Sequence, residues 1–136
     1  MTSETKRAGV VWQSGLVFRG GEAGGPDVVI DGDNRAGPGP MVTLLLAAAA
    51  CTGSDVVVIL EKMRVTLREL RIEVTGVRRE QEPRRYTSIR FDFHVAGEGV
   101  DEPRARRAVS LSLEKYCSVV ASLAPDIQIT YGLTLA

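Results

Sequence analysis

The two cysteines are the residues of this sequence best suited to chemistry. Cys51 ends the run of small and aliphatic residues "LLLAAAAC", and Cys117 follows charged residues in "LEKYCSVV". A cysteine thiolate is a nucleophile, and a sulfenic acid formed on one thiol condenses with a second thiol nearby. Buried cysteines, however, often act only as small apolar side chains. The residue pattern alone therefore leaves two interpretations open: an inert core position, or a reactive thiol in a dry pocket.

Polar residues near both cysteines weaken the inert interpretation. Asp55 lies one helical turn after Cys51 and would share its helix face. Glu114 and Lys115 lie within one turn before Cys117. Polar atoms beside a thiol in a buried helix indicate a pocket with limited access for water rather than a uniform core.

Other common site chemistries lack their sequence patterns. Two distant cysteines and the lone His94 do not form the closely spaced ligand pairs of a zinc site, and His94 is expected at the surface of a strand. The segment "RGGEAGG" lacks the spacing and the following helix of a dinucleotide site. No serine lies in a nucleophile elbow. We therefore expect neither a metal site nor a bound cofactor.

The first elements of the chain are predicted to be short strands followed by a long helix. "AGVVWQSG" and "GLVFRG" read as strands around a turn at residues 14–15, and "VVI" reads as a third strand before a loop at 31–40. A helix is predicted from just after Pro40 to about Met63. Its leucine and valine triplets are apolar on all sides, so we expect it to be buried all round.

A hairpin, a second helix and a strand complete the expected α+β pattern. Residues 65–80 and 86–95 are predicted as antiparallel strands, with the connecting turn in "REQEPRR". One face of the second strand would carry the more polar residues Tyr86, Ser88, Arg90, Asp92 and His94. A helix is predicted from about Glu102 to Leu123, and "DIQITYGLTL" is predicted as the last strand. This order of elements indicates an α+β domain.

The bulk composition argues against several functional classes. The 136 residues include 17 Lys+Arg and 17 Asp+Glu, so the charge gives no support for binding to nucleic acid or an anionic membrane. The apolar stretches Leu44–Cys51 and Val56–Leu60 are separated by "TGSD", and neither is long enough to span a bilayer. With no visible secretory signal, we expect a cytoplasmic protein. It would form a single domain, residues 1–136, with 1–7 disordered.

Three segments carry a resemblance to a known family: "PGPMVTLLLAAAACTGSDVVVILEKM", "EVTGVRREQEPRRYTSIRFDFHVAG" and "RAVSLSLEKYCSVVASL". They resemble the OsmC/Ohr family, in particular the branch whose second cysteine lies in an E-K-Y-C-S sequence. The similarity covers about residues 8 to 135. It implies an α+β fold in which antiparallel sheets wrap around two central helices, in an intertwined homodimer with active sites at the subunit interface.

The same resemblance implies a thiol-dependent peroxidase that reduces organic hydroperoxides. In this interpretation Cys51 becomes a sulfenic acid and Cys117 resolves it as a disulfide. An external dithiol or a lipoylated protein would then reduce the disulfide, and no cofactor would be bound. The alternative is a dimer of the same fold that binds a small apolar ligand without efficient turnover.

The sequence departs from the family pattern at one position of the site. Well-studied members carry a Glu about ten residues before the first cysteine, which helps to orient an Arg against the thiolate; here Met41 stands at that position. The resemblance makes Arg35 and Arg19 the candidates for that Arg, and Arg35 is preferred because its loop immediately precedes the helix that carries Cys51. Glu114 would either replace the missing acid or serve a capping or surface role.

Overall fold

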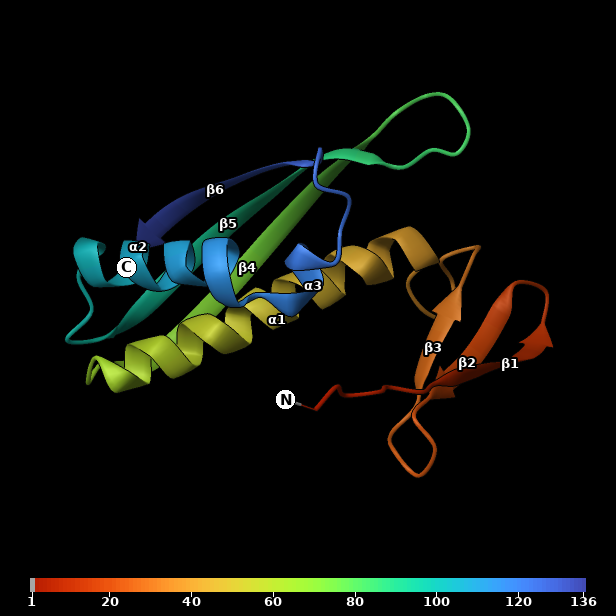
Figure 1. The fold of residues 1–136 in the computed structure, drawn as a ribbon, viewed down its shortest axis with the longest axis horizontal. Helices are drawn as coiled ribbons and strands as arrows, with labels where there is room; N and C mark the ends of the chain where they lie inside the picture. The colour runs from red at the N-terminus through yellow and green to blue at the C-terminus, as the bar shows by residue number, and fades with distance from the viewer. Residues whose placement is uncertain (1) are drawn as a thin grey trace. The chain divides into compact units, whose positions relative to one another are not determined.

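The structure is a computed structural model that describes residues 2–136. Its elements, in chain order, are β1 (Gly9–Ser14), β2 (Val17–Gly21), β3 (Val28–Asp31), α1 (Pro40–Lys62), β4 (Thr66–Arg78), β5 (Tyr86–Glu98), α2 (Glu102–Leu111), the π-helical turn η1 (Ser112–Tyr116), α3 (Ser118–Ala121) and β6 (Gln128–Leu135) (Figure 1). These elements confirm the predicted α+β class. The chain divides into an N-terminal unit up to Leu44 and a C-terminal unit, Leu45–Ala136.

The N-terminal unit contains the three predicted strands, which form an antiparallel sheet in the order β1-β2-β3. Trp12 pairs with Phe18 across β1 and β2, and the register shifts before Ser14. Gly15 follows with a φ of 52°, in the left-handed region that glycine adopts at little cost, so the turn closes there. Of the segment predicted to be disordered, residue 1 lies outside the described residues, and residues 2–7 form neither helix nor strand.

Asp31 organises the loop between β3 and α1. Its buried carboxylate accepts hydrogen bonds from the backbone N–H groups of Asp33 (2.8 Å), Arg35 (3.2 Å) and Ala36 (2.9 Å). These bonds, led by the one from Ala36, hold the pKa of Asp31 below its ordinary value because they favour the charged form. One acidic side chain thus accepts the hydrogen bonds of loop N–H groups that have no partner in a helix or sheet.

The C-terminal unit contains a second three-stranded sheet, in the order β4-β5-β6. β4 and β5 form the predicted antiparallel hairpin, whereas β6 pairs with β5 in parallel, unlike the antiparallel sheets expected. Both α1 and α2 lie over the same face of this sheet (Figure 1). The largest side chains buried in the core include Phe91, Phe93, Leu60, Ile89, Val56, Val95 and Val109.

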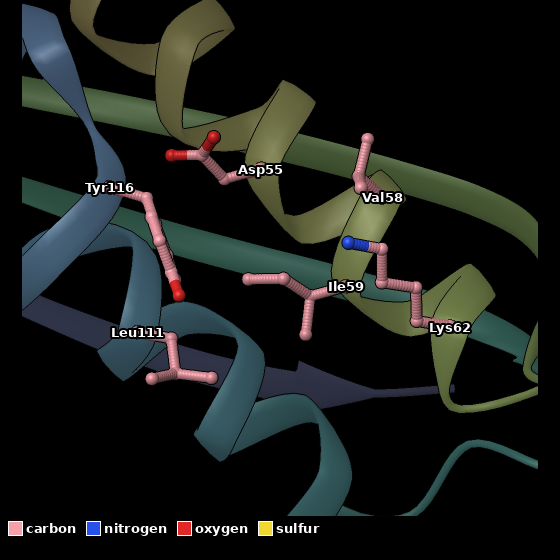
Figure 2. Close-up of a pocket in the computed structure, with 6 residues that line it drawn as sticks. All are labelled: Asp55, Val58, Ile59, Lys62, Leu111 and Tyr116. Carbon is pink, nitrogen blue, oxygen red and sulfur yellow. The ribbon is translucent and has the colours of Figure 1, made fainter. Parts of the chain in front are cut away.

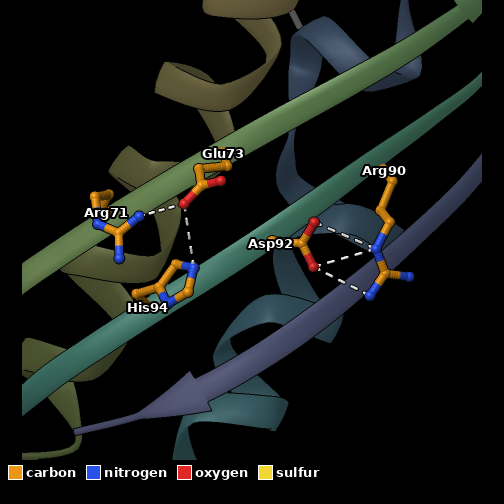
Figure 3. Close-up of polar contacts among 5 residues, drawn as sticks. All are labelled: Arg71, Glu73, Arg90, Asp92 and His94. Carbon is orange, nitrogen blue, oxygen red and sulfur yellow. Dashed lines mark hydrogen bonds and ion pairs between the residues drawn. The ribbon is translucent and has the colours of Figure 1, made fainter.

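The other face of the sheet is polar (Figure 3). Arg90 pairs with Asp92 on β5, with guanidinium–carboxylate distances of 3.1 to 3.3 Å. Glu73 on β4 pairs with Arg71 and lies 3.5 Å from Nε2 of His94. The side chain of His94 is half-buried, on the polar face where the sequence predicts it. Alternation along β5 therefore separates an apolar face toward the helices from a charged outer face.

A register shift changes the first residues of β5. Val77 pairs with Ser88 and Arg78 with Tyr86, so the ladder skips Thr87. As a result Tyr86 is buried and Thr87 is exposed, and the sequence-based placement of Tyr86 on the polar face is wrong. A shift of one residue exchanges the two faces of a strand because side chains alternate with a period of two.

Helix α1 has the predicted bounds, but it is buried on one side rather than all round. Its buried residues are Leu45, Ala48, Ala49, Thr52, Gly53, Val56 and Leu60. Gly53 faces the sheet: a Cβ at this position would lie 3.0 Å from Cδ1 of Ile72, so glycine allows a close approach of helix and strand. Large apolar residues such as Leu46 and Val58 are exposed.

The length and composition of α1 would also suffice to cross a membrane. Its most apolar 18-residue window has a mean hydropathy of 2.0 and is 22% buried. The apolar stretches Leu44–Cys51 and Val56–Leu60, each too short to span a bilayer, both lie in this one continuous helix. Core helices of soluble proteins meet the same criterion. In α1, the buried hydroxyl of Thr52 lies 2.6 Å from the hydroxyl of Ser112, so one side of the helix packs against another helical segment of the same unit.

Candidate active site

Cys51 lies in the middle of α1, where the sequence predicts it. Its side chain is half-buried, next to Thr52 and Gly53, which are both buried. The run of leucine and alanine before it favours a helix, since these residues have the highest helix propensities. The helix therefore presents this thiol at the margin of the buried face rather than at its centre.

Cys117 lies at a break in the second helical segment, and the prediction of one helix from Glu102 to Leu123 is wrong at this point. Helix α2 ends at Leu111, the π-helical turn η1 follows, and Cys117 has an extended backbone with φ −71° and ψ 102°. Its N–H donates to the carbonyl of Ser112 at 2.8 Å, which closes the wide turn. π-helical turns are rare and occur frequently at functional sites.

Both thiols are free, and Cys51 lies close enough to Cys117 to raise its pKa. Cys117 is 3% exposed, and this burial is the main reason that its pKa is raised from 9.0 to about 11. The N–H of Val120, 3.5 Å from the Sγ atom, opposes the rise. A hydrogen bond to Cys51 adds to it. Cys117 is therefore a protonated thiol at neutral pH, near the more accessible sulfur of Cys51.

A buried hydrogen-bond chain lies beside the thiol pair. Thr52 Oγ1 and Ser112 Oγ are 2.6 Å apart, and the Ser112 hydroxyl donates to Asp55 Oδ2 at 2.8 Å. Thr52 and Ser112 are fully buried. Sequence reasoning places Asp55 on the face of Cys51 but misses the two hydroxyls. The available signal was Ser112 itself, a polar residue at a position where the helical spacing of "AVSLSLEKY" expects an apolar one.

A pocket of about 440 Å³ adjoins this cluster (Figure 2). Its lining residues are Asp55, Val58, Ile59, Lys62, Leu111 and Tyr116. Figure 2 shows the α1 side chains on one wall, with Leu111 and Tyr116 on the other. The lining is mostly apolar, but neither cysteine contributes to it, unlike the predicted pocket at the thiol. The pocket lies one helical turn from Cys51 instead of opening directly on its sulfur.

The charged residues proposed for the site lie in different parts of the structure. Arg35 is exposed in the loop after β3, and Arg19 is exposed on β2, where it lies 4.0 Å from Asp27. Both belong to the N-terminal unit, so their assignment to Cys51 stays a prediction. Glu114 is exposed in η1 and lines a separate hollow beside α2, outside the Thr52 and Ser112 hydrogen bonds. Its role as a substitute for the acid also stays a prediction.

Known proteins resemble the chain in sequence over most of its length. A model of the family described as "OsmC-like protein" matches residues 31–132. Protein YhfA of Escherichia coli strain K12 is 40% identical over 127 residues, which cover 93% of this chain and 95% of YhfA. The similarity therefore includes both cysteine-bearing segments.

Solved structures share the fold. A hypothetical protein from Aquifex aeolicus VF5 is 31% identical, with a TM-score of 0.84 over 98% of this chain and 99% of its own. An OsmC-like protein from Mycoplasma pneumoniae has the same TM-score at 16% identity, over 99% of each chain. The organic hydroperoxide resistance protein OhrB of Bacillus subtilis matches with a TM-score of 0.63 and 15% identity, over 96% and 98% of the two chains. With the family match over residues 31–132 and the similarity to YhfA, these findings show that the chain belongs to the OsmC-like protein family.

Proposed function

We propose that this protein is a thiol-dependent peroxidase that reduces organic hydroperoxides, with Cys51 as the nucleophile and Cys117 as the resolving thiol. The observation that carries the proposal is the proximity of a half-buried Cys51 to a buried Cys117 whose pKa is raised to about 11. The accessible sulfur can meet a substrate, and the buried sulfur remains a thiol beside it. Membership of a family whose fold includes organic hydroperoxide resistance proteins supports the same assignment.

The proposed reaction has three balanced steps. The Cys51 thiolate attacks the terminal peroxide oxygen, the O–O bond breaks, and the departing alkoxide takes a proton to become an alcohol. The resulting Cys51 sulfenic acid is attacked by the Cys117 sulfur, a disulfide forms, and the proton of Cys117 leaves with the hydroxyl group as water. An external dithiol, either a small molecule or a lipoylated protein, then supplies two electrons and two protons and becomes a disulfide itself.

The pocket next to the thiol pair supports an organic rather than an inorganic peroxide. Val58, Ile59 and Leu111 offer apolar surface for the alkyl or aryl part of a substrate. Hydrogen peroxide has no apolar group that could bury surface against these side chains. We therefore expect the specificity constant for cumene hydroperoxide to exceed that for hydrogen peroxide, and Ile59→Arg to reduce this preference.

A homodimer in the cytoplasm forms part of the proposal. Large apolar side chains are exposed on β1 and α1: Val10, Val11, Trp12, Val42, Leu44, Leu46 and Val58. Burial of apolar side chains drives association, so a second copy of the chain would be expected to cover residues of this kind. Light scattering should give twice the 14.7 kDa mass of one chain, and Leu46→Glu should shift the mass toward that of a single chain. A wild-type mass of one chain would contradict the dimer.

Thiol counting tests the peroxidase directly. One equivalent of cumene hydroperoxide should remove two thiols per chain from the wild-type protein, as measured with a chromogenic thiol reagent. Cys51→Ser should retain its remaining thiol, whereas Cys117→Ser should lose one thiol to a sulfenic acid that a dimedone adduct identifies. Two unreacted thiols in the wild-type protein would contradict the proposal.

The position of the pocket favours one second candidate, a protein that binds a small apolar ligand without turnover. Neither Cys51 nor Cys117 lines the pocket, so binding there does not require either sulfur. In this case an apolar fluorescent probe should bind to the wild-type protein and not to Ile59→Arg, while cumene hydroperoxide leaves both thiols intact. Consumption of both thiols would instead favour the peroxidase.

A further inference from the structure

The hydrogen-bond chain Thr52–Ser112–Asp55, called the clamp below, has a defined direction. The Ser112 hydroxyl has one hydrogen, and it donates this hydrogen to Asp55 Oδ2 at 2.8 Å. In the 2.6 Å contact with Thr52, Ser112 must therefore accept and Thr52 must donate. Since Thr52 and Ser112 are fully buried, water cannot replace a lost partner, and an unsatisfied hydroxyl would be costly.

The clamp joins the two segments that carry the thiols. Thr52 directly follows Cys51 on α1, and Asp55 is one turn further along the same helix. Ser112 opens the π-helical turn, and its carbonyl accepts the N–H of Cys117 at 2.8 Å. The same serine therefore fixes the backbone of Cys117 through its carbonyl and holds α1 through its hydroxyl.

We propose that Ser112 is a positioning residue, which through the clamp holds Cys117 close to Cys51 and so favours formation of their disulfide. The inference rests on the proposed function only in taking the two cysteines as a working redox pair. Thr52, Ser112 and Asp55 would then control the distance between the two sulfurs without taking part in the reaction themselves.

The physical basis is the effective concentration of one thiol at the other. Two sulfurs that are held together in the reduced protein lose little freedom when the disulfide forms, so the equilibrium constant for oxidation is high. Without the Ser112 hydroxyl, the π-helical turn is no longer tied to α1 by this route. The reduced state then gains freedom that the disulfide must remove, and the effective concentration falls.

The test measures the equilibrium between the protein dithiol and mixtures of reduced and oxidised dithiothreitol at pH 7. In this exchange the two protein thiols give two hydrogens and two electrons to oxidised dithiothreitol, and alkylation followed by mass spectrometry counts the remaining thiols. Ser112→Ala should lower the effective concentration roughly tenfold, the size expected for one buried hydrogen bond. Thr52→Val should lower it at least about threefold by the same reasoning.

Two matched variants separate positioning from general destabilisation. Thr52→Ser keeps the hydroxyl and should restore the wild-type equilibrium. Ser110→Ala removes a hydroxyl from α2 that lies 3.2 Å from the Tyr131 hydroxyl, outside the clamp, and should leave the equilibrium unchanged. If Ser112→Ala does not fold, the comparison of Thr52→Val with Thr52→Ser decides the question.

Two results would overturn the inference. The first is an effective concentration in Ser112→Ala or Thr52→Val that stays within about twofold of the wild-type value although the free energy of unfolding is lower. The clamp would then stabilise the fold without positioning the thiols. The other is a wild-type protein that forms no disulfide even in oxidised dithiothreitol. Because no peroxide is used, a protein that forms the disulfide but does not consume cumene hydroperoxide would refute the peroxidase and leave the positioning role intact.

Discussion

Cys117 should react with iodoacetamide about a hundredfold more slowly than an ordinary thiol at pH 8, because only the thiolate is reactive. With a pKa raised from 9.0 to about 11, its thiolate fraction at that pH falls from roughly one in ten to roughly one in a thousand. Burial is the main cause of the raised pKa, and the nearby Cys51 adds to it. The slow alkylation of Cys117 should therefore persist in Cys51→Ser, at a slightly higher rate than in the wild-type protein.

The measurement is the alkylation rate of Cys51→Ser from pH 7 to 11, followed by intact-protein mass spectrometry. The same variant unfolded in urea supplies the rate of an unburied thiol, and Cys117→Ser reports on Cys51 alone. A midpoint near 9 in the folded protein, with a rate equal to that in urea, would refute the assignment of Cys117 as a buried, protonated thiol.

The raised pKa also predicts a loss of stability at alkaline pH. The folded protein binds the Cys117 proton more tightly than the unfolded chain does, so this contribution is complete below the ordinary thiol pKa of 9.0. It is lost as the pH rises through the folded pKa of about 11. Urea titrations at pH 8 and pH 10.5 should show a larger decrease in the free energy of unfolding for wild type than for Cys117→Ser. Equal decreases would contradict this linkage.

Three further predictions concern the scaffold. Gly76→Ala should lower the free energy of unfolding by about 1–3 kcal/mol in urea, because its Cβ would lie 2.4 Å from Cε1 of Tyr86; an unchanged value would contradict this packing. Gly53→Ala should change stability by less than about 1 kcal/mol, since a gain in helix propensity offsets the contact of its Cβ with movable Ile72 Cδ1, whereas Gly53→Leu should be clearly destabilising. In wild type, hydrogen-exchange protection of the amides bonded to the Asp31 carboxylate should be present above its unfolded pKa and decline as the pH falls through its lowered folded pKa. In Asp31→Asn the protection of these amides should be weaker and should not follow this titration. Protection in the wild-type protein that does not change across this pH range would contradict the role of the Asp31 carboxylate.

Elements with strong local signals were predicted closely. The bounds of α1 follow from a proline at its start and a long run without a further proline, and the β4–β5 hairpin follows from alternation on both sides of a polar turn. The exchange of Tyr86 and Thr87 was not predictable, because it depends on a register shift between two strands. The exposed side of α1 was also missed, since an apolar pattern on all sides does not reveal how much of it one chain can cover.

The candidate site was only partly readable from sequence. The family resemblance implies that Cys51 and Cys117 act as a pair, and in the structure Cys51 is near enough to Cys117 to raise its pKa. The π-helical turn before Cys117 was missed because "SLEKYCSVV" contains no glycine or proline that would signal a break in the helix. The pairing of Thr52 with Ser112 was missed because a hydrogen bond between distant segments leaves little local trace.

The π-helical turn also decides which of two neighbouring side chains points into the protein. In a regular α-helix the residues rotate by about 100° each, so the fourth residue after Ser112 would return to its buried face. That residue is Tyr116. The wider turn instead bonds the fifth residue, Cys117, back to Ser112, and Cys117 is 3% exposed while Tyr116 is 50% exposed and lines the pocket. The additional residue in the turn thus changes the rotational phase of the helix, which sends the sulfur inward and the phenol ring outward irrespective of side-chain polarity.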